Sequence, residues 1–309
     1  MKISVLVVGL GKIGMEYDLK NNYNLTHFNS FYKNKKFKVV GVCDTNLKKK
    51  IFFKEKKIKF FSNYKQALKI LKPKVVVVST TTNKHYEILL NSLKHKSVKL
   101  ILCEKPFCLN TKQAIKIKLL DKLNKVYVNY MRSADDIFYK KVIKKIKNNK
   151  NLFIEIFYKG SVLNNASHYI HLLTKYFGKC KKILKIKKFN ANSFDFNLIF
   201  KGNIQASFLS SNVRNLFLDS MRFYTPKLII NYDNGGHLIY SLKNVLNPIY
   251  LTPNYFELNN VLKNKFYENS QKDIVANVYN CLSKKKHSLC NSEEAIEVHK
   301  IMSKIINAK

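Results

Sequence analysis

The chain has 309 residues and a formal net charge of +38, with 57 lysines and arginines against 19 acidic residues. The length suits two domains of ordinary size, and such a charge taken alone suggests nucleic acid or an anionic membrane surface as a partner. Only three of the 57 basic residues are arginines, and the lysines are scattered among abundant Asn, Ile, Phe and Tyr. Because arginine is expected wherever guanine or phosphate is bound in a bidentate manner, we attribute the charge to coding bias and exclude a specific nucleic-acid role.

The six cysteines show no CxxC pair and no histidine partners at metal-ligand spacing, so we expect reduced, structural thiols and no metal site. They are Cys43, Cys103, Cys108, Cys180, Cys281 and Cys290. The N-terminus resembles a signal peptide only until Gly9–Lys12 interrupts its apolar run, and no small-residue cleavage site follows. No segment approaches transmembrane length. These features predict a soluble, cytoplasmic protein without a membrane partner.

The first predicted element is a strand over Ile3–Val8, an almost continuous apolar run of the kind found in parallel strands buried on both faces. It leads into a dinucleotide-binding fingerprint, Gly-x-Gly-x-x-Gly, formed by Gly9, Gly11 and Gly14. Gly9 permits a tight turn and Gly11 lets the backbone approach a pyrophosphate. Gly14 allows the following helix to pack closely, with its N-terminal amides facing the anion. The alternative is a glycine-rich turn without a ligand, and the strand-turn-helix order makes that alternative the less favoured one.

A second strand is expected over Val39–Asp44, and it ends in a carboxylate. An acid in this position accepts hydrogen bonds from the adenosine ribose hydroxyls and repels a 2′-phosphate, so Asp44 predicts a preference for NAD over NADP. A strand-end turn aspartate is the alternative, because the distance from Gly14 exceeds the usual roughly twenty residues. The extra length lies between Met15 and Leu25.

Three more strands are predicted in the first part of the chain, with a helical stretch over 85–90 after the first of them. The strands are Val75–Val78, Leu100–Cys103 and Val126–Tyr130. Strands that alternate with helices indicate βαβ crossovers and a parallel sheet with right-handed connections. The sequence therefore predicts a Rossmann dinucleotide-binding domain over residues 1–130.

From residue 131 onward the pattern changes. After a helical stretch over 136–147, strands follow in close succession with short turns such as Lys201–Asn203, which indicates a mostly antiparallel sheet. The expected strands are 152–159, 183–189, 194–201, 204–210, 216–224 and 228–232. Two helices close the chain, and the last begins at Asn291 with Glu294 in the capping-box position. We predict that residues 131–309 form a second domain.

Glu104, Lys105 and Pro106 follow the strand Leu100–Cys103, roughly ninety residues behind the fingerprint, a spacing that joins the fingerprint to a catalytic lysine. Residues after such a strand lie at the ligand-bearing edge of the sheet. One more solvated lysine is the alternative in so lysine-rich a chain, but the position after a buried strand favours catalysis. Oxidation of a secondary alcohol needs a base near the hydroxyl and a cation that stabilises developing negative charge. Lys105 can supply the cation.

Further motifs occur in order along the chain. They are Ser79-Thr80 with His85, Tyr130-Met131-Arg132, and Asn164 to His171 leading to Gly178. Together with the fingerprint, Asp44 and Glu104-Lys105-Pro106, they resemble the Gfo/Idh/MocA family of oxidoreductases over nearly the whole chain. The resemblance implies a Rossmann domain over residues 1–130. It implies that residues 131–309 form a C-terminal α/β domain with an open, mostly antiparallel sheet, used for substrate binding and oligomerisation. It also implies a homo-oligomer, a dimer or a tetramer.

The resemblance implies roles for individual residues. Lys105 hydrogen-bonds the reacting hydroxyl and the cofactor, and His168 is the acid/base, with an unperturbed pKa of about 6.5 that suits proton exchange near neutrality. Glu104 faces the nicotinamide ribose or holds Lys105, and the peptide before Pro106 is cis as in many relatives. The cofactor-binding set is Gly9, Gly11, Lys12, Ile13, Gly14, Asp44, Ser79, Thr80, His85, Glu104 and Lys105. The substrate set is Lys105, Arg132, Asn164, His168 and His171.

The segment around His168 departs from the most familiar family pattern, which has an aspartate four residues before the histidine and another three after it. Here these positions hold Asn164 and His171, which argues against simple polyol dehydrogenases. Asparagine at the first position resembles the branch that acts on UDP-linked amino sugars and uronates. His171 is either a substrate contact or a hydrogen-bonded structural histidine on the helix face that it shares with His168. A zinc site is disfavoured because no carboxylate or cysteine lies nearby in sequence.

Two other features have two interpretations each. Tyr17 and Asp18, in the extended segment after the fingerprint, resemble a variant found in oxidoreductases of surface-polysaccharide gene clusters. We expect a lid over the cofactor there, with an exposed loop aspartate as the alternative for Asp18. Arg132 either contacts an anionic part of the substrate or forms an interdomain ion pair.

These observations predict an NAD-dependent dehydrogenase or reductase that transfers hydride between nicotinamide and a secondary alcohol or ketone of a sugar or nucleotide-sugar, in surface-polysaccharide biosynthesis. The positive charge is compatible with such an anionic substrate. A catalytically silent sensor that binds NAD and a sugar is the alternative, suggested by Asn164 and opposed by the intact Lys105 and His168. A third interpretation, a Rossmann reductase of a tetrapyrrole or lactam, would not need His168.

Overall fold

The computed structural model describes residues 2–20, 23–149, 151–216 and 218–308, which form two compact units. The first unit comprises Met1–Ala134 and Glu268–His299, and the second comprises Asp135–Tyr267 and Lys300–Lys309. The segment 268–299 therefore packs with residues that are distant from it in sequence. The two domains expected from the sequence, with a boundary at residue 130, stay a prediction.

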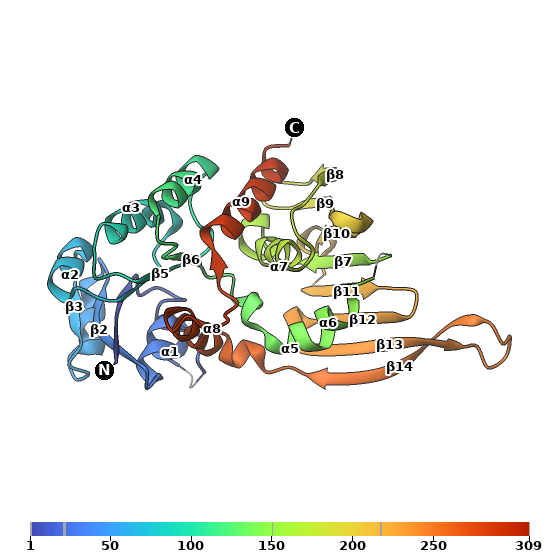
Figure 1. Ribbon diagram of the computed structural model, residues 1–309, viewed down its shortest axis with the longest axis horizontal. Helices are drawn as coiled ribbons and strands as arrows, with labels where there is room; N and C mark the ends of the chain where they lie inside the picture. The colour runs from blue at the N-terminus through green and yellow to red at the C-terminus, as the bar shows by residue number, and fades with distance from the viewer. Residues whose placement is uncertain (1, 21–22, 150, 217, 309) are drawn as a thin grey trace. The chain divides into compact units, whose positions relative to one another are not determined.

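The first unit is built on a sheet with the strand order β15-β6-β5-β4-β1-β2-β3 (Figure 1). Its strands are β1 (Ile3–Val8), β2 (Phe37–Cys43), β3 (Lys59–Phe61), β4 (Val75–Val78), β5 (Leu100–Cys103), β6 (Val126–Val128) and β15 (Cys290–Asn291). All neighbours pair in parallel except β15, which runs antiparallel to β6. Every residue of β4 and β5 is buried, as expected for apolar strands covered on both faces. The order of β1 to β6 is that of a Rossmann sheet, which confirms the predicted fold class.

Helices accompany this sheet, with α8 beginning and α9 ending among residues of the second unit. They are α1 (His27–Lys33), α2 (Tyr64–Leu71), α3 (Thr82–Leu93), α4 (Thr111–Leu120), α8 (Phe266–Leu282) and α9 (Ser292–Ile306). The predicted start of α9 is confirmed. Asn291 Oδ1 accepts hydrogen bonds from the Glu293 and Glu294 N–H groups at 2.9 Å, and the Asn291 N–H donates to the Glu294 carboxylate at 3.1 Å. This reciprocal arrangement is a capping box.

The second unit is built on a sheet with the order β14-β13-β12-β11-β7-β10-β9-β8 (Figure 1). Its strands are β7 (Phe153–Tyr158), β8 (Lys182–Lys188), β9 (Phe194–Ile199), β10 (Gln205–Ser210), β11 (Ser220–Tyr224), β12 (Leu228–Asp233), β13 (Leu238–Leu246) and β14 (Pro253–Lys263). The β7–β10 pair is parallel and the other described pairs are antiparallel, which confirms the prediction of a mostly antiparallel sheet. The long β13–β14 hairpin was not predicted.

The strand expected over 216–224 begins only at Ser220. A short 3₁₀ helix, Asn212–Arg214, ends at Asn215, whose φ of 52° is left-handed. The Leu216 N–H then donates to the Ser211 carbonyl at 3.1 Å. The Leu216 N–H therefore bonds locally and does not take part in strand pairing.

One face of the second sheet carries the core of its unit. Buried and half-buried residues alternate along β9, as in a sheet packed on one face only. The helical stretch over 136–146 contains α5 (Asp136–Phe138), a π-helical turn and α6 (Lys144–Ile146). Phe138 lies 6.1 Å from Phe223 of β11 and 4.9 Å from Tyr232 of β12, measured between ring centroids. These aromatic contacts fix the helical stretch on the sheet.

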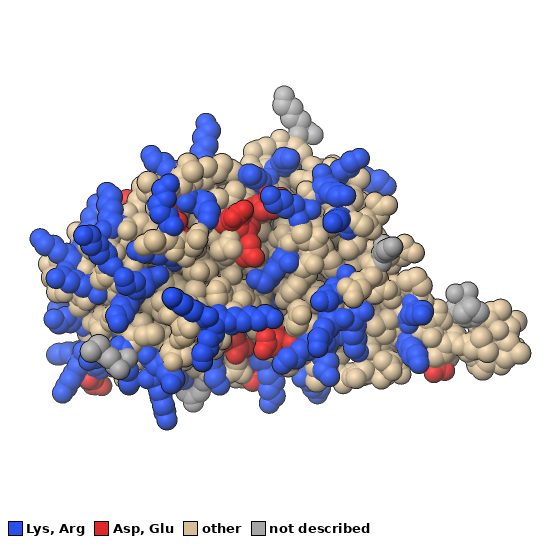
Figure 2. All heavy atoms as spheres, in the orientation of Figure 1, with Lys and Arg blue, Asp and Glu red and all other residues tan. Residues whose placement is uncertain are grey.

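Lysine and arginine side chains are spread over the visible face of the molecule rather than gathered in one stripe (Figure 2). This distribution follows from the scattered lysines of the sequence. None of the helices among the described residues is long and apolar enough to cross a membrane. No disulfide joins the six cysteines, which all lie among the described residues, as the sequence predicted.

Candidate active site

A side chain is excluded at two of the three fingerprint glycines by contacts within the protein. Gly9 has a φ of 95°, and a Cβ there would lie 2.6 Å from the Ser79 carbonyl. A Cβ on Gly14 would overlap the Gly9 carbonyl oxygen, whereas a Cβ on Gly11 would meet no protein atom within 4 Å. The protein's own packing thus requires the outer two glycines and leaves open space at Gly11. That space fits the close approach of a dinucleotide pyrophosphate to the backbone.

The expectation that a helix follows Gly14 directly is wrong. Turns and a 3₁₀ helix, Glu16–Asp18, come first, and α1 begins only at His27. The first amides of α1 are already occupied, because the His27 N–H donates to the Ile13 carbonyl at 3.1 Å and the Phe28 N–H to the Gly14 carbonyl at 3.0 Å. The inserted residues 15–25 are the physical reason, since they separate the glycine turn from the helix. Lys12 is exposed and Ile13 is half-buried at this turn.

Asp18 connects the inserted segment to the start of α1. Its carboxylate accepts hydrogen bonds from the Leu25 N–H at 3.0 Å, from the Thr26 N–H at 2.9 Å and from the Thr26 hydroxyl at 2.6 Å. These three bonds give Asp18 a structural function within the loop. Tyr17 beside it is about half exposed, at 49%. The predicted lid over the cofactor stays a prediction.

Asp44, directly after β2, is bonded to the fingerprint loop. Its Oδ2 accepts a hydrogen bond from the Leu10 N–H at 2.7 Å, and its Oδ1 accepts one from the Asn46 N–H at 2.9 Å. Lys49 lies 3.4 Å from the same Oδ2, donates to the Leu10 carbonyl at 2.8 Å and pairs with Glu16 at 2.9 Å. Burial opposes the charge on Lys49, but the Glu16 and Asp44 carboxylates raise its pKa above the ordinary value. Lys49 and Glu16 were missed from the sequence, where nothing relates them to Asp44.

The residues predicted after β4 shape the loops around the site. The Ser79 hydroxyl donates to the Gly9 carbonyl at 2.8 Å, and the Thr80 hydroxyl bonds its neighbour's carbonyl at 3.4 Å. His85 is fully buried, with Nδ1 3.0 Å from the Pro106 carbonyl oxygen and Nε2 3.0 Å from the Thr80 carbonyl oxygen. His85 therefore connects the loop after β4 to the loop after β5.

Glu104 and Lys105 follow β5, and the cis peptide predicted between Lys105 and Pro106 is confirmed. Glu104 is buried, and its Oε1 lies 2.7 Å from Nε2 of His27 and 2.6 Å from the amide nitrogen of Asn129. Burial alone would raise the pKa of Glu104, but the hydrogen bond and charge of His27 hold it below the ordinary value. Burial lowers the pKa of Lys105, and the positive charge of Arg132 adds to this effect, while the Glu104 carboxylate opposes it. Arg132 itself is buried.

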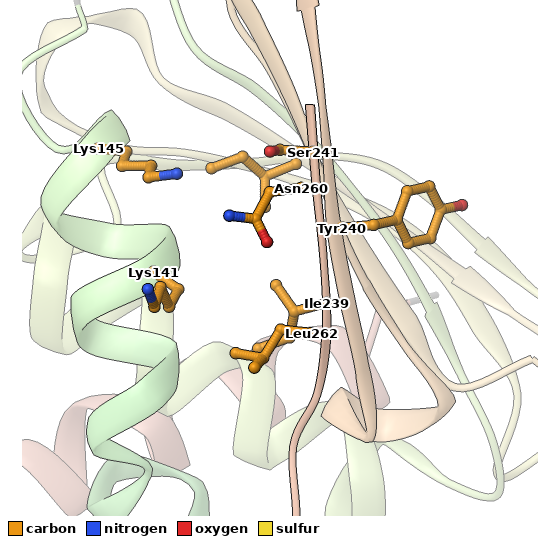
Figure 3. A pocket seen from close by; sticks show the side chains of 8 residues that line it. Lys141, Lys145, Ile239, Tyr240, Ser241, Asn260 and Leu262 are labelled. Atoms are coloured by element: carbon orange, nitrogen blue, oxygen red, sulfur yellow. The ribbon is translucent and has the colours of Figure 1, made fainter. Parts of the chain in front are cut away.

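The remaining predicted residues lie in the second unit. Asn164 is exposed within a π-helical turn, Val162–Ala166, and its N–H donates to the Ser161 hydroxyl at 3.2 Å. His168 and His171 are both buried on α7 (Ser167–Phe177), three residues apart on the same side of the helix. The candidate residues thus form two groups, one in each unit. None of the candidate residues lines the separate pocket of the second unit that Figure 3 shows. That pocket is lined by Lys141, Lys145, Ile230, Ile239, Tyr240, Ser241, Asn260 and Leu262.

The fold and the fingerprint define the first unit as a Rossmann dinucleotide-binding domain. Residues 3–130 match the family model described as "Oxidoreductase family, NAD-binding Rossmann fold". The chain carries the Rossmann domain of the Gfo/Idh/MocA family, which confirms the resemblance recognised in its motifs. No curated protein gives a significant match.

Solved structures share the fold along the whole chain. The dehydrogenase MviM from Clostridium difficile has a TM-score of 0.75 at 18% identity, covering 99% of each chain. The WlbA dehydrogenase from Bordetella pertussis, solved with NADH and UDP-GlcNAcA, has a TM-score of 0.74 at 14% identity and covers 98% of this chain and 94% of its own. The UDP-N-acetylglucosamine 3-dehydrogenase GnnA from Acidithiobacillus ferrooxidans has a TM-score of 0.73 at 13% identity, covering 99% and 97%. At these identities the likeness establishes the fold.

Proposed function

We propose that the protein is an NAD-dependent dehydrogenase or reductase that acts on a secondary alcohol or ketone of a sugar or nucleotide-sugar. The observation that carries the proposal is Lys105, a half-buried lysine two residues after the end of β5 in a Rossmann sheet whose glycine loop is open at Gly11. Burial lowers the pKa of Lys105 although the Glu104 carboxylate opposes this, so Lys105 releases its proton more readily than a surface lysine does.

The chain's own residues divide the chemistry between them. When bound, NAD supplies the hydride acceptor for oxidation or the hydride donor for reduction. In the direction of oxidation, Lys105 donates a hydrogen bond to the reacting oxygen and stabilises the negative charge that develops on it. His168 accepts the hydroxyl proton as the hydride leaves the carbon, and returns it in reduction. Gly11 and Asp44 bind the pyrophosphate and the adenosine ribose, and Arg132 and Asn164 contact the substrate.

Several observations support a nucleotide-sugar as the substrate. WlbA was solved with UDP-GlcNAcA, and GnnA is a UDP-N-acetylglucosamine 3-dehydrogenase. Asn164 replaces the aspartate of the polyol branch, and the net charge of +38 attracts an anionic ligand. We place the reaction in the biosynthesis of a surface-polysaccharide sugar.

We also propose a cytoplasmic homo-oligomer. Six cysteines without a disulfide among them suit a reducing compartment. The second sheet exposes apolar side chains in strands β7 and β14, with Phe153 38% and Leu258 63% exposed. Such residues on an open sheet face favour contact with another copy of the chain.

The proposal is tested by following nicotinamide absorbance after the protein is mixed with NAD or NADH and a panel of UDP-, CMP- and free amino sugars, uronates and their keto forms. Turnover with a member of the panel, lost in Lys105→Ala and His168→Ala while NADH still binds, supports the proposed enzyme. NADH binding without turnover on the whole panel favours the silent sensor instead, for which Asn164 in place of a carboxylate is the motivating observation.

A further inference from the structure

Buried polar side chains from other elements of the first unit form a hydrogen-bonded network with Glu104. His27 of α1 donates from Nε2 to Glu104 Oε1 over 2.7 Å, because a carboxylate oxygen can only accept. Asn129, after β6, donates to the same oxygen at 2.6 Å, and its amide nitrogen also lies 3.3 Å from the side-chain oxygen of Gln271 in α8. His27, Glu104, Asn129 and Gln271 are each at most 7% exposed. All four belong to the first unit.

This network ends on the backbone of Lys105. The second carboxylate oxygen of Glu104, Oε2, accepts the Lys105 N–H at 3.3 Å. On the other side of the lysine, the Pro106 carbonyl oxygen lies 3.0 Å from Nδ1 of the buried His85. Buried side chains therefore bond the backbone on both sides of the Lys105 side chain.

Stability alone is a weak reason for such an arrangement. A buried carboxylate is costly to desolvate, and replacing a buried charge pair by apolar residues of similar volume is often neutral or stabilising. A fully bonded polar network does, however, hold its members in one geometry. A misplacement of about 1 Å in a reacting group can cost about 100-fold in rate, so geometry at Lys105 is a sufficient reason for the network.

We propose that His27 is a positioning residue that acts through Glu104 to fix the orientation of Lys105. The role of the lysine in turnover rests on the proposed function. The contact between His27, Glu104 and the Lys105 backbone does not depend on it. His27 lies outside every motif that the sequence offered, and it reaches Glu104 across 77 positions of the chain.

Two amide substitutions of His27 test whether its hydrogen bond to Glu104 positions Lys105 or whether the side chain only fills space. In His27→Gln the amide nitrogen reaches about as far as Nε2 and can still donate to Glu104. In the matched variant His27→Asn the shorter side chain reaches only the position of Nδ1, which has no hydrogen-bond partner among the described residues. We expect kcat to fall about 10-fold or more in His27→Asn and to stay within about 2-fold of wild type in His27→Gln, with NADH affinity unchanged in both.

A second readout is independent of turnover. The rate at which an N-hydroxysuccinimide ester acetylates Lys105 is followed against pH by peptide mass spectrometry. The charged groups that influence Lys105 are Glu104 and Arg132. Without the His27 bond, burial favours the neutral form of Glu104, and the lysine loses a charge that supports its ammonium form. The midpoint of Lys105 reactivity should therefore move to lower pH in His27→Asn and stay in place in His27→Gln.

A midpoint that is unchanged or raised in His27→Asn, or that moves equally in both variants, overturns the proposal. If His27→Asn does not fold, as judged by circular dichroism and NADH binding, Glu104→Gln replaces it, because this variant keeps the shape and removes the charge. Its midpoint must also fall, and an unchanged midpoint contradicts the proposal. Full turnover in Lys105→Ala would instead refute the proposed function and leave the reactivity test of His27 intact.

Discussion

Asp44 and Glu104 occupy equivalent positions in sequence, since each directly follows a buried strand of the same parallel sheet, yet the structure surrounds them differently. Asp44 accepts hydrogen bonds from two backbone amides and lies beside Lys49. Glu104 accepts hydrogen bonds from the side chains of His27 and Asn129, which are both buried. The same pattern of a strand followed by an acid therefore produces a loop anchor in one place and the end of a buried network in the other.

The comparison shows that two acids in the same position after a strand can have different roles, and that each role depends on the acid's hydrogen-bond partners. Asp44 bonds the Leu10 N–H of the glycine loop, and we expect the adenosine ribose to bind at this carboxylate. Glu104 is buried and bonded to His27 and Asn129, and we propose that Lys105 beside it serves the ligand. We call the residues around Asp44 and the glycine loop the Asp44 end, and the residues around Glu104 and Lys105 the Glu104 end. Each of the following predictions changes one end and leaves the other as a reference.

The largest effect is expected at the Glu104 end. Lys105→Met should lower kcat by about 100-fold or more, because the reacting oxygen loses its cationic hydrogen-bond donor. NADH affinity, measured by fluorescence titration, should change by less than about 2-fold. Lys99→Met is the matched control, since Lys99 is exposed just before the opposite end of β5. Equal turnover in the two variants would contradict the assigned role of Lys105.

The glycine loop offers a matched pair of substitutions. Gly14→Ala places a Cβ on the Gly9 carbonyl oxygen, so unfolding should become easier by about 1–3 kcal/mol, measured by urea denaturation. Gly11→Ala meets no protein atom within 4 Å, so stability should be retained while the Kd for NADH rises about 10-fold. If Gly11→Ala binds NADH as wild type does, the pyrophosphate does not approach this residue.

A smaller effect is expected at the Asp44 end. Asp44→Ser should shift the ratio of NADH to NADPH affinity about 10-fold toward NADPH, because a repelling carboxylate is removed and Lys49 loses one of its two acidic partners. Adding Lys49→Met in the same protein should cancel much of that gain. An unchanged affinity ratio in Asp44→Ser would show that Asp44 does not discriminate between the two cofactors.

The smallest effect concerns pH. The pKa of Glu104 is lowered in the folded protein, chiefly by the His27 hydrogen bond acting against burial. The stability that ionised Glu104 contributes is therefore fully present above its unfolded pKa of about 4.3 and is lost as pH falls through the folded value. Urea unfolding of wild type and Glu104→Gln should differ at pH 7 and converge in acid. A difference that is constant over this range would contradict the shift.

The sequence was informative wherever a pattern repeats locally. Apolar runs such as Val75–Val78 and Leu100–Cys103 coincide with β4 and β5, and the Asn291 capping box lies where it was predicted. The β13–β14 hairpin was missed because asparagines interrupt the alternation that would have revealed it, as at Asn259 and Asn260.

Interactions between distant residues could not be predicted. His27 reaches Glu104 across 77 positions and Lys49 reaches the Leu10 carbonyl across 39, and a single sequence contains no periodicity that relates such pairs. The insertion after Gly14 was visible as extra length, but its effect on the start of α1 depends on the Asp18 hydrogen bonds. The motifs therefore predicted which residues are candidates for the site, whereas the hydrogen-bond partners of these residues could be found only in the tertiary structure.

A crystal structure of the protein with NADH tests the central claim most directly. The account predicts that the adenosine ribose hydroxyls lie within hydrogen-bond distance of the Asp44 carboxylate, that the pyrophosphate contacts the backbone at Gly11, and that the nicotinamide lies beside Lys105. A dinucleotide bound in the opposite direction, or away from the carboxyl ends of β1, β2 and β5, would contradict it.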